Sequence, residues 1–173
     1  NLDFDCWKKE GHGTINLRGA IANSCNVYFY RLGGILGADL IARYAAEFGF
    51  GKPTGIKLYG EAKGLVPTRM WKLITKGESW YEGETLSFAI GHGYLLATPI
   101  QLARFISGVA NDGILIRPQI VKSTDEKEKS PVSFERLSIS KETLKIVKEA
   151  MLDVVENEHG TGHNASVAGL EIA

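Results

Sequence analysis

The sequence predicts a single α+β domain. Apolar residues recur at helical spacing in residues 38–48, 99–109 and 141–156, which predicts three amphipathic helices. Two later segments, residues 114–121 and 167–172, have the short apolar runs of strands. Because helices and strands come from distant parts of the chain, the α+β class is favoured, and 173 residues suffice for one modest domain with its own core.

The charge of the chain is balanced. Lys and Arg number 20, Asp and Glu number 20, and the formal net charge is zero, with the basic residues dispersed. A nucleic-acid-binding surface needs clustered basic residues, so we expect no nucleic-acid partner. No run of about 18 apolar residues occurs, so no transmembrane helix is predicted. The sequence starts at Asn1 without a methionine and ends on a strand-like run, from which we expect a fragment of a longer protein.

The N-terminal part is expected to form a loop and two helices. Residues 1–15 are loop-like, and Asn16 is a suitable N-cap for a helix over residues 17–23. Residues 27–32 are apolar or aromatic on nearly all sides, which predicts a buried helix. Gly33-Gly34 is expected to end this second helix.

The middle of the chain alternates between helical and loop-like character. Gly49 should end the helix over residues 38–48. Residues 50–70 contain Gly and Pro at close intervals, which predicts a structured loop with short strands at residues 56–58 and near Leu65.

Residues 70–83 are weakly amphipathic and contain two large aromatic side chains, Trp71 and Trp80. The two side chains could be platforms for a substrate, but partial burial in the core is the more common role of such residues.

The clearest local signal is a helix start at residues 98–101. Thr98 is a suitable N-cap, Pro99 occupies the first helical position, and Gln101 can reach back to complete a capping box. Asn111-Asp112-Gly113 should close this helix.

The C-terminal part begins with the strand predicted over residues 114–121. Residues 123–130 carry a run of charges that is typical of a solvated surface loop. Ser140 is a suitable N-cap for the helix over residues 141–156. A polar, glycine-containing loop over residues 157–166 should connect it to the last predicted strand.

A short polar interruption, Ser24-Cys25-Asn26, separates two apolar helical segments. Polar side chains in such a place cost stability unless they find partners. In one interpretation Ser24 is simply the N-cap of the second helix. In the other, Ser24 and Asn26 lie in a turn and face a cleft, where a hydroxyl relays a proton and an amide binds a substrate carbonyl.

Five segments, in order and at matching spacing, resemble one protein family. They are NLRGAIANSCNVYFY at residues 16–30, FGFGKPTGI at 48–56, GLVPT at 64–68, IGHGYLLATPIQLA at 90–103 and NDG at 111–113. The first segment resembles the Ser-x-Asn motif of penicillin-binding proteins, and the set is most similar to the class B, elongation-type members. The resemblance implies a transpeptidase domain with the serine β-lactamase-like fold. Residues 1–173 would supply its helical subdomain and part of the flanking sheet.

The resemblance also implies a reaction and its parts. Acyl-serine chemistry in this superfamily uses S-x-x-K, which holds the nucleophile, then S-x-N, then K-T-G on a strand. Ser24 would relay a proton, and Asn26 would bind the acyl substrate. The nucleophile is expected before Asn1 and the K-T-G strand after Ala173, so this fragment alone should be inactive.

Two segments imitate the missing motifs. Residues 138–141, Ser-Ile-Ser-Lys, match S-x-x-K by letters but follow Ser-x-Asn, and Ser140 is better used as a helix cap. Residues 159–162, His-Gly-Thr-Gly, lack the lysine of K-T-G. We also expect His92 to be a packed polar residue between two glycines and not a general base.

Three functional classes share these motifs. The elongation-type matches favour a D,D-transpeptidase that cross-links peptidoglycan stem peptides ending in D-Ala-D-Ala and is a target of β-lactams. The alternatives are a D-Ala-D-Ala carboxypeptidase or β-lactamase of the same fold, or a non-catalytic β-lactam sensor. The resemblance further implies a membrane-embedded glycan polymerase as partner, and a location at the inner membrane with this domain on the periplasmic or extracytoplasmic face.

Two cysteines, Cys6 and Cys25, flank His12. The residues alone leave three interpretations open: two free thiols, one disulfide, or a zinc site that uses both thiolates and the imidazole. A closed zinc site needs a fourth ligand, which could be Asp3, Asp5 or a residue upstream. Some elongation-type penicillin-binding proteins carry a structural zinc with His and Cys at the positions of His12 and Cys25, which favours the metal.

Overall fold

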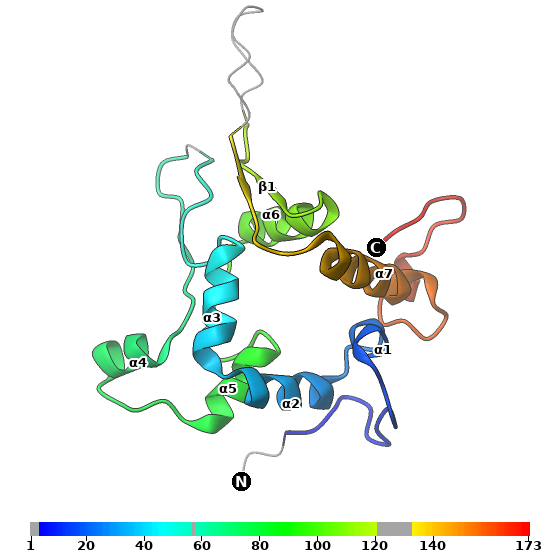
Figure 1. The fold of residues 1–173 in the computed structure, drawn as a ribbon, viewed down its shortest axis with the longest axis horizontal. Coiled ribbons are helices and arrows are strands. Elements are labelled where there is room, and N and C mark those ends of the chain that lie inside the picture. Colours follow the sequence, from blue (N-terminus) through cyan, green and yellow to red (C-terminus); the bar gives the residue numbers. More distant parts are fainter. Residues whose placement is uncertain (1–3, 57, 121–132) are drawn as a thin grey trace, which may run out of the picture.

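The computed structural model describes residues 4–56, 58–120 and 133–173. Seven α-helices and two strands are found in these residues (Figure 1). In chain order they are α1 Leu17–Ala22, α2 Asn26–Leu36, α3 Ala38–Glu47, α4 Arg69–Lys76, α5 Glu82–Ala89, α6 Pro99–Ala110, β1 Ile114–Ile116, β2 Phe134–Arg136 and α7 Lys141–Glu156. A 3₁₀ helix, η1, follows at His163–Ala165. The chain therefore has the mixed helix-and-sheet character that the sequence predicts.

Elements from the two ends of the chain meet in space. Helix α1 lies beside α7, and α2 lies beside α5; these two pairs make the most extensive contacts between elements (Figure 1). Helix α6 packs on β1, which pairs antiparallel with β2 so that Leu115 lies opposite Glu135. No helix in the described ranges is long and apolar enough to cross a membrane.

The α2–α5 contact explains why α2 is longer than predicted. The sequence suggested an end at Gly33-Gly34, but α2 continues to Leu36. Gly33 is buried, and a Cβ atom at this position would overlap the Cβ of Ala89 on α5. The glycine therefore allows two helices to approach closely, and the prediction that it breaks the helix was wrong.

Two groups of apolar side chains form the core. The first joins α3 and α5 through Ala38, Ala42 and Phe88, with the half-buried Trp80 packed against it. The Trp80 indole donates a hydrogen bond to the Thr85 hydroxyl at 2.8 Å. Trp80 is thus partly buried core, as predicted.

The second group lies where α6, α7 and the antiparallel pair of β1 and β2 (the hairpin) meet. Leu115 of β1 and Leu144 of α7 are almost fully buried. A Cβ atom on Gly108 of α6 would overlap the Leu115 side chain, so α6 and β1 also pack at a glycine.

The helix starts agree closely with the sequence. Asn16 caps α1, and Ser140 caps α7 by accepting a hydrogen bond from the Thr143 backbone N–H at 3.1 Å. Thr98 and Gln101 form the predicted capping box at α6. In contrast, α5 was not predicted; Glu84 accepts a hydrogen bond from the Tyr81 backbone N–H at 2.7 Å and thereby caps it.

The strands agree less well. The predicted strand over residues 114–121 is formed only at Ile114–Ile116, and residue 121 lies outside the described ranges. At Leu65 a single bridge to Leu96 replaces a strand, and residues 56 and 58 are not in strands, while residue 57 is not described. Residues 167–172 contain one bridge, Val167 to Leu170, instead of the predicted strand. The charged segment 123–130 lies outside the described residues.

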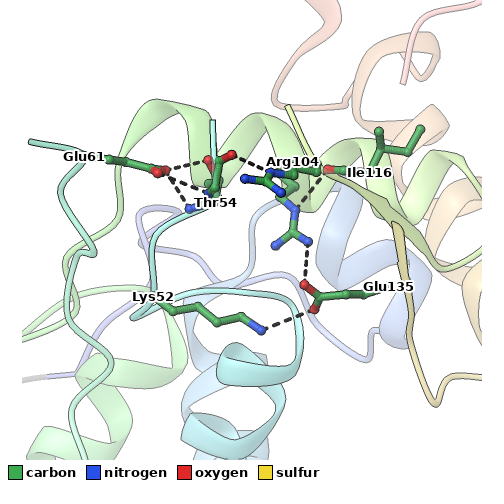
Figure 2. Close-up of polar contacts among 8 residues, drawn as sticks. Lys52, Thr54, Glu61, Arg104, Ile116 and Glu135 are labelled. Atoms are coloured by element: carbon green, nitrogen blue, oxygen red, sulfur yellow. Dashed lines mark hydrogen bonds and ion pairs between the residues drawn. The ribbon is translucent and has the colours of Figure 1, made fainter. Parts of the chain in front are cut away.

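A carboxylate organises the loop between α3 and α4. Glu61 accepts hydrogen bonds from the backbone N–H and hydroxyl of Thr54 at 2.6 and 2.5 Å, and from the Gly55 N–H at 3.1 Å (Figure 2). The Thr54 hydroxyl is the main cause that lowers the pKa of Glu61 from its ordinary value. The loop is therefore ordered by a charged acceptor and not by strand pairing.

Buried Arg104 connects α6 to the hairpin next to this loop. Its guanidinium donates to the Ile116 carbonyl at 3.1 Å and lies 3.2 Å from the Glu135 carboxylate (Figure 2). Lys52 of the loop pairs with the same carboxylate at 3.3 Å. Loop, helix and hairpin thus share one polar network.

Candidate active-site turn and metal-ligand cluster

The turn between α1 and α2 holds the first group of candidate residues. Helix α1 ends at Ala22, and α2 begins at Asn26. Ser24 has a φ of 49°, in the left-handed region, and Cys25, not Ser24, occupies the N-cap position of α2. The N-cap interpretation of Ser24 was therefore wrong.

Backbone hydrogen bonds hold Ser24 in this conformation. The N–H of Ser24 donates to the Ile21 carbonyl at 3.1 Å, and the N–H of Cys25 donates to the Ala20 carbonyl at 2.9 Å. Ala20 and Cys25 are both buried. A left-handed residue other than glycine costs about 1–2 kcal/mol, so the surrounding packing has to maintain the turn.

The turn leaves the two candidate polar residues accessible. Ser24 is exposed, and Asn26, the first residue of α2, is half-buried. They lie in a turn and at a helix start, so their side chains are not spaced as on one regular helix. Such an arrangement can offer a hydroxyl and an amide to a bound molecule.

A second hydroxyl lies against Ser24. The Oγ of Ser24 is 2.9 Å from the Oγ1 of Thr161, a residue 137 positions later. The N–H of Thr161 also donates to the Ala22 carbonyl at 3.1 Å. No role for Thr161 was predicted, because no local pattern indicates that the loop after α7 returns to this turn.

An ion pair fixes α1 to α7 next to the turn. The Arg18 guanidinium donates two hydrogen bonds to the carboxylate of Asp153, through Nε and, at 2.8 Å, through Nη2. Glu149 lies 3.5 Å from the same guanidinium. The hydrogen bond from Arg18 lowers the pKa of Asp153.

Cys6, His12 and Cys25 form the second group. Their ligand atoms all lie within 4.8 Å of one another, and the Sγ of Cys6 is 3.5 Å from the Nδ1 of His12. Both cysteines are free thiols. Cys25 is buried, and the other two residues are half-buried.

The geometry of this group fits a zinc ion. Zn–S and Zn–N bonds of about 2.3 and 2.0–2.1 Å at a tetrahedral angle place sulfur and nitrogen about 3.5 Å apart. The Nε2 of His12 is buried and has no hydrogen-bond partner among the described residues. A ligating histidine normally engages both ring nitrogens, one with the metal and one with a neighbour; here Nδ1 faces the Cys6 sulfur and is the nitrogen placed to bind zinc.

The environment of Cys6 favours a thiolate. Burial raises the pKa of its thiol, but hydrogen bonds from the backbone N–H groups of Lys8, Asn26 and Val27 outweigh that effect and lower the pKa. Two of these N–H groups belong to the first turn of α2, where the helix dipole also favours negative charge.

Comparison with known proteins decides the family. The family described as "Penicillin binding protein transpeptidase domain" matches residues 1–173, the whole chain. The chain belongs to the penicillin-binding protein transpeptidase family.

The chain is similar to several curated relatives. It is 37% identical over 164 residues to "Peptidoglycan D,D-transpeptidase MrdA" of Acinetobacter baumannii, covering 92% of this chain and 24% of the relative. Identity to the protein of the same name in Escherichia coli K12 is 34% over 166 residues, covering 91% of this chain and 26% of the relative. The chain therefore spans about a quarter of the length of these relatives.

Solved structures support the same family. "Penicillin-Binding Protein (PBP2) from Helicobacter pylori" matches with a TM-score of 0.86 and 33% identity, covering 94% of this chain and 30% of that one. The Pseudomonas aeruginosa PBP2 in complex with WCK 5153 matches with a TM-score of 0.82 and 36% identity, covering 92% and 35%. The predicted fold class, a penicillin-binding protein transpeptidase domain, is confirmed.

The structure also places the remaining candidate residues. Ser140 caps α7, which explains the S-x-x-K letters at residues 138–141. His92 lies between two glycines of positive φ, but it is exposed, so the prediction that it is packed was wrong. Asp5 is not part of the Cys6–His12–Cys25 group, and Asp3 lies outside the described residues.

Proposed function

We propose that residues 1–173 supply the Ser-x-Asn turn of a peptidoglycan D,D-transpeptidase. The observation that carries the proposal is the Ser24 turn: a hydroxyl held at the surface in a left-handed conformation, next to Asn26 at the start of α2. The named relatives and PBP2 structures support it. In the proposal, the S-x-x-K nucleophile and the K-T-G strand belong to parts of the protein outside these residues.

The proposed reaction is acyl transfer through a serine ester. The nucleophilic serine, activated by its lysine, attacks the carbonyl of the D-Ala-D-Ala bond, and the terminal D-Ala leaves with a proton on its amine. An amine of a neighbouring stem then attacks the ester, loses a proton and releases the serine.

Ser24 and Asn26 serve this reaction in different ways. The Ser24 hydroxyl both accepts and donates a proton, so it can pass one between the lysine and the leaving or attacking amine. The Asn26 amide hydrogen-bonds the acyl substrate and orients the lysine. A bound stem peptide or β-lactam would therefore contact this turn.

The test uses the full-length protein and a penicillin. Intact mass after incubation reports the acyl-enzyme, and its rate of formation should fall by about 100-fold or more in Ser24→Ala and in Asn26→Ala. Ser140→Ala, which removes only the cap of α7, is the control and should react at nearly the wild-type rate. An unchanged rate in both turn variants would refute the assignment.

Product analysis separates the three activities that share these motifs. A transpeptidase transfers the acyl group to a D-amino-acid acceptor, and a carboxypeptidase or β-lactamase transfers it to water. A sensor stays acylated and transfers the acyl group neither to a D-amino acid nor to water. Formation of the transfer product is the result we expect.

We also propose that Cys6, His12 and Cys25 bind a structural zinc ion. Zinc would tie the N-terminal loop to the residue between Ser24 and Asn26, with the fourth ligand supplied from outside the described residues. The 3.5 Å distance from the Sγ of Cys6 to the Nδ1 of His12 and the grouping of all three ligand atoms within 4.8 Å support this site.

Protein purified without chelator should contain nearly one zinc per chain by native mass spectrometry. Cys25→Ser should lose the metal and lower the thermal stability. Metal-free wild-type protein with a Cys6–Cys25 disulfide would refute the zinc site.

Two solved neighbours support a proposal about location and partners. One solved neighbour is a complex of H. pylori PBP2 with MreC, and another is a peptidoglycan synthase complex that couples polymerization and crosslinking. We propose that this protein likewise works with a membrane-embedded glycan polymerase, on the outer face of the inner membrane. Co-purification of a polymerase with the full-length protein from membranes would test this, and a protein that purifies alone from the cytoplasm would contradict it.

A further inference from the structure

We infer that Thr161 is a positioning residue for Ser24. Its hydroxyl lies 2.9 Å from the Ser24 hydroxyl, and its backbone N–H donates a hydrogen bond to the Ala22 carbonyl at 3.1 Å. The inference rests on the proposed role of Ser24 in proton relay and adds a residue that acts through it.

The backbone around Thr161 is anchored to two helices. The N–H of Thr161 donates to the carbonyl of Ala22, the last residue of α1, at 3.1 Å. The N–H of Gly162 donates to the carbonyl of Val154 in α7 at 2.9 Å. The loop therefore satisfies carbonyl groups at the C-terminal ends of both helices, which fixes the position of Thr161 relative to the Ser24 turn.

The glycines on either side of Thr161 are required by this packing. A Cβ atom on Gly160 would overlap the Val154 carbonyl and lie 2.5 Å from the Asp153 carbonyl oxygen. A Cβ atom on Gly162 would lie 2.9 Å from a methyl group of Val154. Thr161 is therefore the one residue of Gly160-Thr161-Gly162 that can carry a side chain toward α1, and that side chain meets Ser24.

The Thr161 hydroxyl can orient the Ser24 hydroxyl, because either of the two can be the donor. The Thr161 hydroxyl is within 3.4 Å of the Ala22 carbonyl, which can only accept. When Thr161 donates to this carbonyl, its own lone pairs accept the proton of the Ser24 hydroxyl. The lone pairs of Ser24 then stay free to accept a proton from a group of the cleft, and when Thr161 donates to Ser24 instead, the Ser24 proton is free to pass to the amine. Because Ser24 is exposed, water would otherwise compete for its hydroxyl and leave the side chain free to change rotamer.

The test compares hydroxyl and methyl at one position in the full-length protein. Thr161→Val keeps the branched shape and the backbone hydrogen bond but removes the hydroxyl; Thr161→Ser keeps the hydroxyl. Acylation by a penicillin should slow about 3- to 10-fold in Thr161→Val, the value of one hydrogen bond, and stay within about twofold of wild type in Thr161→Ser. Thermal unfolding should be the same for both variants.

A double variant separates positioning from a purely structural role. In the Ser24→Ala background, Thr161→Val should cause no further loss of acylation rate, because the residue through which Thr161 acts is gone. A wild-type rate in Thr161→Val, or an equal additional loss in the double variant, would overturn the inference. If Thr161→Val proves unstable, Thr161→Ala in the same cycle gives the same comparison without the second methyl group.

The outcomes also distinguish this inference from the proposed function. If Ser24→Ala acylates at the wild-type rate, the relay role of Ser24 fails, and the inference fails with it. If Ser24→Ala is slow while Thr161→Val is not, the relay role stands and only the positioning by Thr161 is wrong.

Discussion

At the scale of single residues, two adjacent glycines of α2 have opposite surroundings. Gly33 faces α5, where a Cβ atom would overlap that of Ala89, whereas a Cβ on exposed Gly34 would meet only the Leu86 side chain, at 3.8 Å. Gly33→Ala should therefore lower the free energy of unfolding by about 1–3 kcal/mol, because α2 and α5 must separate. Gly34→Ala, the matched control, should raise it by up to about 1 kcal/mol through better helix propensity. Urea unfolding of the two variants checks this pair, and equal effects of the same sign would contradict it.

The same two glycines show the limit of prediction from single residues. Glycine is unfavourable inside a helix by about 1 kcal/mol, so a Gly-Gly pair predicts a helix end. Close packing of α2 on α5 outweighs that preference, and the partner residue, Ala89, cannot be identified from the sequence around Gly33. The N-cap interpretation of Ser24 failed for a similar reason. Its residue type suits an N-cap, but its left-handed φ depends on the buried residues Ala20 and Cys25 on either side of it.

At the scale of elements, α6 depends on one buried amide. The Gln101 side chain accepts a hydrogen bond from the Thr98 backbone N–H at 2.8 Å. Its amide nitrogen donates to the carbonyls of Lys52 and Lys63, both at 2.9 Å. Gln101 thus completes the helix cap and also fixes the loop between α3 and α4.

Gln101→Glu removes the two hydrogen bonds that the Gln101 amide nitrogen donates and should destabilise the fold. A carboxylate can still accept from Thr98 but cannot donate, so two carbonyl groups lose their partners and face a buried oxygen. We expect a loss of about 3 kcal/mol in the free energy of unfolding. Thr98→Ser, which keeps the capping oxygen, should change it by less than about 0.5 kcal/mol. A midpoint of chemical denaturation for Gln101→Glu equal to that of wild type would contradict the assigned donors.

Helices could be predicted better than strands for a physical reason. The starts of α1, α6 and α7 depend on caps within three or four residues, and the sequence places them correctly. A strand depends on a partner at a distance, so apolar runs such as residues 167–172 predict strands that do not form here. Helix α5 was missed because its cap, Glu84, reaches Tyr81, which is not a residue type that signals a helix start.

At the scale of the whole molecule, the candidate site combines short-range and long-range parts. Cys6, His12 and Cys25 lie within 20 positions of one another, so their proximity could be anticipated from the sequence, and the structure brings all three together. Ser24 and Asn26 could be singled out from their motif. Thr161 could not, since it reaches Ser24 only through the contact between α1 and α7.

The Arg18–Asp153 pair between α1 and α7 should make the stability of the fold depend on pH. The pKa of Asp153 is lowered from its ordinary value of 3.8, mainly by the hydrogen bond from Arg18. A carboxyl group whose pKa is lower in the folded protein stabilises the fold above its unfolded pKa, and this contribution is lost as the pH falls through the folded value. The contribution of the Arg18–Asp153 pair should therefore be complete at neutral pH and should fade as the pH falls below about 5.

Asp153→Asn isolates this contribution from the other acidic groups. The variant should be less stable than wild type at pH 7, and the difference in the free energy of unfolding should shrink steadily toward low pH, because protonated Asp153 and asparagine then resemble each other in charge. Glu149→Gln is the matched control: Glu149 touches Arg18 through one 3.5 Å contact and is more exposed, so its substitution should give a smaller difference at every pH. Urea unfolding at a series of pH values measures both curves. A difference for Asp153→Asn that stays constant from neutral to acid pH would mean that the pair holds α1 to α7 by packing and not by charge.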